Sequence, residues 1–129
     1  MKPLTTTETA KFANLKILRI LDCFEAINFT TECLIDNEKY VHWWCDEESF
    51  GVRWLFIKTT SKNISDYTHG KISALKFICN GISLVLIDTG WGPNIKKVIT
   101  AHEVEIHEIT KYLPNPRAFY LDDEGIGYQ

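Results

Sequence analysis

The amino-acid sequence predicts a single α+β domain, a mostly antiparallel β-sheet meander with one or two short helices packed on it. Between residues 15 and 58, short runs rich in aromatic and β-branched residues follow one another with brief polar connections, which is typical of a meander. After residue 60 the segments begin with Ser and are typical of short helices. The 129 residues suffice for one hydrophobic core. We therefore expect an N-terminal arm (1–12), one domain (13–121) and a C-terminal tail (122–129).

Four strands are expected in the first half of the chain. The first is expected in LKILRILDCF, which is apolar at almost every position and so indicates a strand that is central or covered on both faces. The second is expected in FTTECLI, whose alternation indicates one wetter face. Two more are expected in YVHWWC and VRWLFIKT, which are rich in aromatic and β-branched residues. Short connections predict that these strands are antiparallel neighbours.

The second half is expected to add helices and at least two further strands. Ser61 can cap a short helix through Tyr67, and Ser73 can cap a second helix that Gly81 would end with a positive φ angle. A buried strand is indicated by ISLVLID, and a turn by TGWGPN. A last hairpin or one bent strand is predicted from IKKVIT and VEIHEIT.

Composition argues against several classes of protein. The net charge of −3 lacks the basic excess with which general nucleic-acid binders neutralise phosphates. No apolar run reaches the roughly 18 residues of a membrane span, and the N-terminus has no apolar signal-peptide core. The four cysteines form no CxxC pair, which argues against a zinc site or a disulfide framework and favours a cytoplasmic location. These residues are Cys23, Cys33, Cys45 and Cys79.

The hairpin of residues 40–58 contains three of the four tryptophans. A register in which paired residue numbers sum to 97 places Trp43 opposite Trp54 in the core and Trp44 opposite Arg53 on the other face. A shift by one residue would put Arg53 among core residues, and burying an unpaired guanidinium is costly. We therefore expect the first register, with Arg53 able to lie over Trp44 as a cation–π pair.

The second face of this hairpin is the candidate partner-binding surface. It would carry Tyr40, His42, Trp44 and Arg53, and Trp, Tyr and Arg are the residues enriched at binding hot spots. Trp91, set between two glycines, is a further candidate. The alternatives are a sheet face that the downstream helices cover and, for Trp91, a ring folded back on the core.

No segment carries a catalytic or metal-binding spacing. Three consecutive carboxylates, at residues 46–48, diverge on a turn and predict a solvated loop rather than a cation site. His102 and His107 would point to opposite faces of a strand. The segment DTGWGPN lacks the third glycine of a dinucleotide-binding loop. We therefore expect no catalytic residue, no metal ligand and no cofactor.

The order of these features resembles a family of small bacterial domains of unknown function. The resemblance rests on LKILRILDCFEA, KYVHWWCDEESFGVRWLFIK, HGKISALKF, a strand ending in LID, and YLPNPRAFYL, and it covers Leu15 to Leu121. It implies a non-enzymatic accessory or interaction role alongside larger bacterial defence proteins, and it brings no catalytic residues.

The sequence thus favours a small cytoplasmic adaptor that acts through protein–protein contacts, with a different partner or with a second copy in a homodimer. Two alternatives stay open. One is a small hydrolase or nucleotide-binding enzyme whose site assembles only in three dimensions. The other is a nucleic-acid contact protein, which the overall acidity disfavours and which would use Arg19, Arg53, Lys96 and Lys97.

Overall fold

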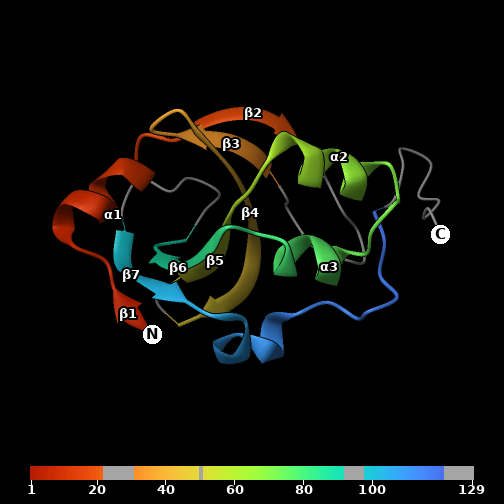
Figure 1. Ribbon diagram of the computed structural model, residues 1–129. Helices are drawn as coiled ribbons and strands as arrows, with labels where there is room; N and C mark the ends of the chain where they lie inside the picture. The colour runs from red at the N-terminus through yellow and green to blue at the C-terminus, as the bar shows by residue number, and fades with distance from the viewer. Residues whose placement is uncertain (22–30, 50, 92–97, 121–129) are drawn as a thin grey trace.

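The computed structural model describes residues 1–21, 31–49, 51–91 and 98–120 (Figure 1). In these residues seven strands form one antiparallel sheet, in the order β1-β7-β6-β5-β4-β3-β2. Each strand from β2 to β6 therefore pairs with the next one along the chain, and β1 pairs with the outer side of β7. The predicted α+β class and the antiparallel meander are confirmed.

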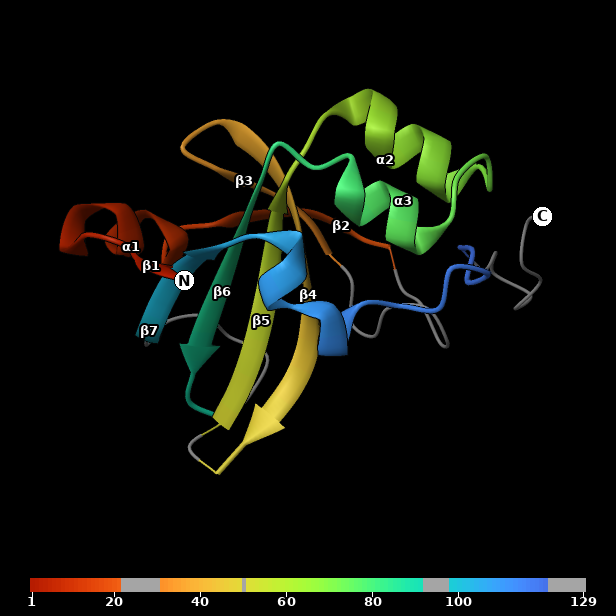
Figure 2. The same ribbon diagram turned by 60° about the horizontal axis from the view of Figure 1, so that its bottom comes forward.

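The helices lie on both faces of this sheet. The strands are β1 (Lys2–Pro3), β2 (Lys16–Ile20), β3 (Thr31–Ile35), β4 (Glu38–Glu48), β5 (Gly51–Lys58), β6 (Ser83–Thr89) and β7 (Val98–Val104). The helices are α1 (Thr6–Phe12), α2 (Ser61–Thr68) and α3 (Ala74–Cys79), with two 3₁₀ turns, η1 (Ile106–Glu108) and η2 (Thr110–Tyr112). Figure 2 shows α2 and α3 next to each other and α1 at the other side of the molecule.

Two hydrophobic clusters divide the core between the two faces. We call them the α2/α3 face and the α1 face, after the helices that cover them. The α2/α3 face includes Val41, Trp43, Leu55, Ile57, Leu84 and Leu86, packed against Ile64, Tyr67 and Phe77. The α1 face includes Cys33, Ile35, Tyr40, Trp54, Phe56, Val85 and Ile87, packed against Phe12. Because strand side chains alternate, neighbouring residues of β4, β5 and β6 contribute to different clusters.

Local sequence explains the connections. Asp36 and Asn37 both have positive φ angles, 54° and 62°, as a two-residue hairpin turn requires, and they join β3 to β4. Ser73 caps α3 as predicted, accepting a hydrogen bond from the Lys76 N–H at 3.1 Å. The cap of α2 is Thr60, one residue before the predicted Ser61. The expected positive φ at Gly81 is wrong, because α3 ends at Cys79 with Asn80 still in the right-handed helical region.

The predicted register of the β4–β5 hairpin is wrong by one residue. Trp43 lies opposite Leu55 and Trp44 opposite Trp54, and an irregularity at Cys45 then brings Asp46 opposite Arg53. Trp43 and Trp54 are both buried, as expected, but on opposite faces. Arg53 therefore does lie on the side of Trp43, and this is tolerated because it is not unpaired there.

Two other expectations about strands are wrong. The strand in LKILRILDCF is neither central nor covered, because β2 is an edge strand whose five side chains are all exposed. The segment VEIHEIT does not continue as a strand, because β7 ends at Val104 and η1 begins at Ile106. The N-terminal arm contains β1 and α1, and the expected C-terminal tail of residues 122–129 lies outside the described residues.

Candidate interaction surface

Strand β2 exposes large apolar side chains at one edge of the sheet. The exposed fractions are 73% for Ile20, 59% for Ile17 and 41% for Leu18. The outer side of an edge strand also presents backbone N–H and C=O groups that no neighbouring strand satisfies, and proteins usually blunt such edges. Within the described part of the chain, no other strand pairs with this side of β2. An apolar, unpaired edge is therefore the strongest candidate for a contact surface.

The side chains of β2 are sorted by chemistry onto the two faces of the sheet. Ile17 lies opposite Cys33 and Ile20 opposite Thr31, so both isoleucines point to the α1 face. Lys16 lies opposite Leu34 and Arg19 opposite Glu32, on the α2/α3 face. The pairing shifts by one residue between Ile17 and Arg19, which places Leu18 at a bulge. One side of the edge is therefore apolar and the other cationic.

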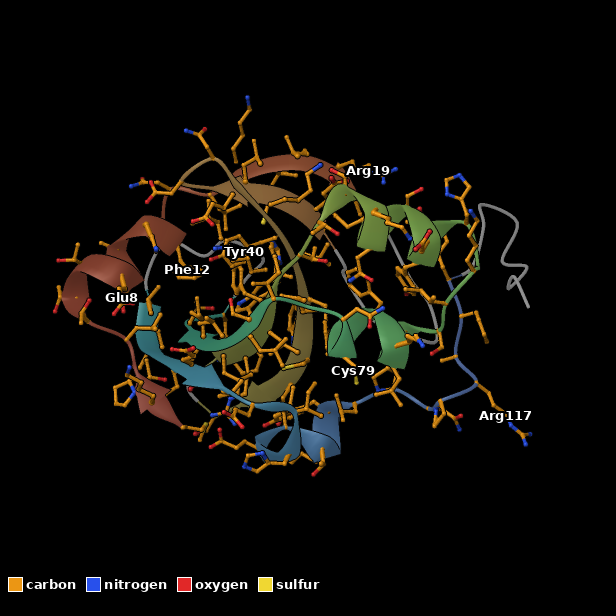
Figure 3. The ribbon with its side chains drawn as sticks, viewed as in Figure 1. Glu8, Phe12, Arg19, Tyr40, Cys79 and Arg117 are labelled. Carbon is orange, nitrogen blue, oxygen red and sulfur yellow. The ribbon has the colours of Figure 1, made fainter. Side chains whose placement is uncertain are left out.

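A buried carboxylate organises the cationic side. The Arg19 Nε atom donates to Glu32 Oε1 at 2.6 Å, and Lys39 Nζ lies 2.9 Å from Glu32 Oε2. Burial alone would raise the pKa of Glu32, but the bonds from Arg19 and Lys39 outweigh it and hold that pKa below its ordinary value. Lys39 also donates to Ser61 Oγ at 3.0 Å, which links this group to α2. Figure 3 shows Arg19 beside the start of that helix.

The residues predicted to bind a partner do not form one surface. Tyr40 and His42 are buried on the α1 face, where the Tyr40 ring lies 5.7 Å from that of Phe12 (Figure 3). Trp44 is half-buried on the same face, 5.8 Å from the Trp54 ring. Arg53 lies on the α2/α3 face, away from these three, because of the register shift. The expected grouping of Arg53 with Trp44 is therefore wrong.

Trp91 differs from these four residues because its side chain is largely exposed. It follows β6 and is 61% exposed, so the alternative of a ring folded back on the core is wrong. The residues that follow it, 92–97, lie outside the described part of the chain, together with Lys96 and Lys97 of the nucleic-acid alternative. As a contact residue, Trp91 stays a prediction.

Arg53 belongs to a polar cluster that crosses four elements. Its Nε and Nη2 atoms donate to Asp88 Oδ1 and Oδ2 at 2.7 and 3.1 Å, and Nη1 donates to the Tyr112 hydroxyl at 2.8 Å. Thr100 Oγ1 donates to Asp88 Oδ2 at 2.7 Å. Burial raises the pKa of Asp88, but the bonds from Arg53 and Thr100 outweigh it, so the carboxylate stays ionised. The cluster links η2 to the sheet, and the positive charge of Arg53 is balanced by the negative charge of Asp88.

His42 is the least satisfied polar group in the described core. Its side chain is enclosed by Trp54 and Phe56, whose ring centroids lie 5.2 and 4.8 Å from the imidazole. Both ring nitrogens are buried without a hydrogen-bond partner. Burial lowers the pKa of His42 to about 4, so the ring is neutral at physiological pH.

Two open grooves border α1. The larger, of about 470 Å³, lies between α1 and β7 and is lined mainly by apolar and threonine side chains such as Leu4, Thr9 and Val98. The smaller, of about 190 Å³, lies near Phe12 and Tyr40. The larger groove is also lined by His102, and the smaller by Ser83, Glu8 and Glu103. Across the described residues, no three His, Cys, Asp or Glu side chains are grouped as metal ligands would be.

Comparison of the chain with protein-family models, with curated proteins and with solved structures finds no significant match. None of the helices in the described ranges is long and apolar enough to cross a membrane. The β2 edge was not singled out from the sequence, although one signal was available: Lys16 and Arg19 interrupt the apolar run, and cations are common on edge strands.

Proposed function

We propose that this protein is a binding module that captures an extended segment of a partner protein along the outer edge of β2. The observation that carries the proposal is the outer edge of β2, which no strand of the described residues pairs with and on which Ile17, Leu18 and Ile20 are all exposed. An added strand would satisfy the free backbone groups, and such main-chain hydrogen bonds supply much of the affinity when a peptide extends a sheet. Alternate side chains of the added strand would then contact the isoleucines, which gives specificity.

The rest of the described chain suits a scaffold for this edge. Strand β3 holds β2 from inside the sheet, and β3 is itself paired along its length with β4. The Arg19–Glu32–Lys39 group fixes the cationic side of the edge to the strands behind it. A rigid template loses little conformational entropy when a partner binds, so the partner bears most of the ordering cost. The proposed role is that of an adaptor and needs no catalytic residue.

The proposal is tested by blocking the edge with charge. Ile17→Lys/Ile20→Lys should abolish pairing, because it places two charges where the apolar side chains of the added strand would lie. Ile82→Lys/Ile99→Lys is the matched control, since it adds the same charge and both side chains are exposed, by 62% and 49%. Each variant and the unaltered protein serve as bait in a lysate of the source organism. We expect the same proteins on the unaltered bait and the control, and their loss from Ile17→Lys/Ile20→Lys. Equal retention on all three baits would contradict the proposal.

A further inference from the structure

The two faces of β2 differ so strongly that they restrict what can pair with it. On the α1 face, an added strand would meet Ile17 and Ile20, which are large and apolar. On the α2/α3 face it would meet Lys16 and Arg19. Lys39, in β4, lies further inside the sheet on the same face. In an added antiparallel strand, side chains directly opposite one another share a face, so the partner must alternate in the same way.

Among the described residues, one buried carboxylate faces the cations on this side of the edge. Glu32 is the carboxylate that pairs with both Arg19 and Lys39. Lys16 lies on the same face of β2 as Arg19, so three cations and one carboxylate of the described residues lie on this side of the edge, although the whole chain carries a net charge of −3. The Arg19 side chain is 55% exposed while that of Glu32 is 8% exposed, so the accessible charge that the described residues place at this edge is positive. Carboxylates on a partner would be attracted here.

A second copy of the chain fits this edge poorly. Antiparallel pairing of two copies of β2 would bring Lys16 and Arg19 of one copy close to the same two residues of the other. Like charges opposite one another destabilise a sheet. In such a dimer the isoleucines of the two copies could pack together, but the cations of the two copies would repel each other.

We infer that the segment recognised along β2 is an extended strand of a different protein, with apolar side chains on one face and Asp or Glu on the other. This inference rests on the proposed function, and it adds the chemistry of the partner. The carboxylates would lie against Lys16 and Arg19, and the apolar side chains against Ile17 and Ile20. Leu18, at the bulge, would lie between the two sets.

Three synthetic peptides test this chemistry, with alternating Val and Glu, Val and Ser, or Val and Lys, each labelled for fluorescence anisotropy. We expect the Val–Glu peptide to bind about fivefold or more tightly than the Val–Ser peptide, from two opposite-charge pairs of the usual cross-strand strength. The Val–Lys peptide should bind most weakly. The preference for Val–Glu should shrink as salt is added, because both cations are partly exposed.

A charge reversal at the edge gives the sharper result. Lys16→Glu should remove or invert the preference for the Val–Glu peptide. Lys2→Glu is the control, because Lys2 is an exposed lysine in β1, at the opposite edge of the sheet, and the change in net charge is the same. The control should keep the preference of the unaltered protein.

The other outcomes are separable. Equal binding of the Val–Glu and Val–Ser peptides, both lost in Ile17→Lys/Ile20→Lys, would overturn the acidic partner and leave strand addition standing. Failure of all three peptides to bind would also overturn the inference, and the lysate comparison would then decide the proposed function separately. Tight binding of a single-stranded oligonucleotide would replace the inferred partner by a nucleic acid. A dimer in analytical sedimentation that Lys16→Glu strengthens would replace it by a second copy of the chain.

Discussion

Arg53 and Asp88 lie opposite each other on β5 and β6 and form a two-point ion pair, with Nε 2.7 Å from Oδ1 and Nη2 3.1 Å from Oδ2. The pair sits at the end of the α2/α3 face, where Tyr112 and Thr100 complete its hydrogen bonds. The guanidinium and the carboxylate neutralise each other, and their polar atoms form hydrogen bonds. The pair can therefore lie beside a hydrophobic cluster, whereas either charge alone would be strongly destabilising there.

Asp88→Ala should therefore destabilise the fold. The change leaves the Arg53 guanidinium without its carboxylate and Thr100 without its acceptor, and breaking one side of such a pair costs about 3 kcal/mol. Urea denaturation at pH 7 measures the loss. Lys62→Ala is the control, because Lys62 and Asp66 form an exposed pair one helical turn apart, and such pairs contribute little. Similar midpoints for Asp88→Ala and the control would show that the cluster does not stabilise the fold.

The buried tryptophans give a second prediction. Trp43→Ala and Trp54→Ala should each lower the free energy of unfolding by roughly 3 to 5 kcal/mol, the range for removing a buried aromatic ring. Trp54→Ala also removes the 2.9 Å hydrogen bond from its Nε1 to Thr89. Trp91→Ala is the matched control and should change stability by less than about 0.5 kcal/mol, because its ring is exposed. Chemical denaturation of the three variants measures this, and an equal loss in all three would refute the assignment of core and surface.

The meander could be predicted from the sequence because its signals are local. Aromatic and β-branched runs mark β3, β4 and β5, and Asp36–Asn37 has the residue types that a tight hairpin turn favours. The caps of the helices are local signals too, as Ser73 shows. Each of these depends on residues within a few positions of one another.

The hairpin register could not be predicted because its deciding contact is distant. The sequence argument against placing Arg53 on the core side assumed that no partner would be present. That partner is Asp88, 35 residues further on, and Tyr112, 59 residues further on, completes the site. Only the pairing of β5 with β6 and the return of the chain through η2 bring them together.

The candidate surface was missed for a related reason. The hydropathy of LKILRILDCF is the same whether the strand is buried at the centre of a sheet or exposed at its edge. What distinguishes the two cases is the number of neighbouring strands, and strand order depends on the whole chain. The burial of Tyr40 and His42 likewise depends on Phe12 and Phe56, which come from α1 and β5.

His42 should make the stability of the protein depend on pH below neutrality. In the unfolded chain a histidine binds a proton below its ordinary pKa of 6.5, whereas in the fold burial lowers the pKa of His42 to about 4. Between these two values the proton binds preferentially to the unfolded state. The stabilising contribution is therefore complete above pH 6.5 and is lost as the pH falls toward 4.

His42→Leu removes this dependence, because leucine has a similar volume and no proton to bind. Other groups also titrate in this range, so the quantity to follow is the difference in unfolding free energy between the variant and the unaltered protein, measured by urea denaturation from pH 7.5 to 4.5. We expect that difference to shift in favour of the variant by about 2 to 3 kcal/mol over this interval, since one pKa unit corresponds to about 1.4 kcal/mol. A part of the difference that is the same at every pH reflects the change in packing and not proton binding. A difference that stays the same at every pH would mean that the imidazole is not held neutral in the fold.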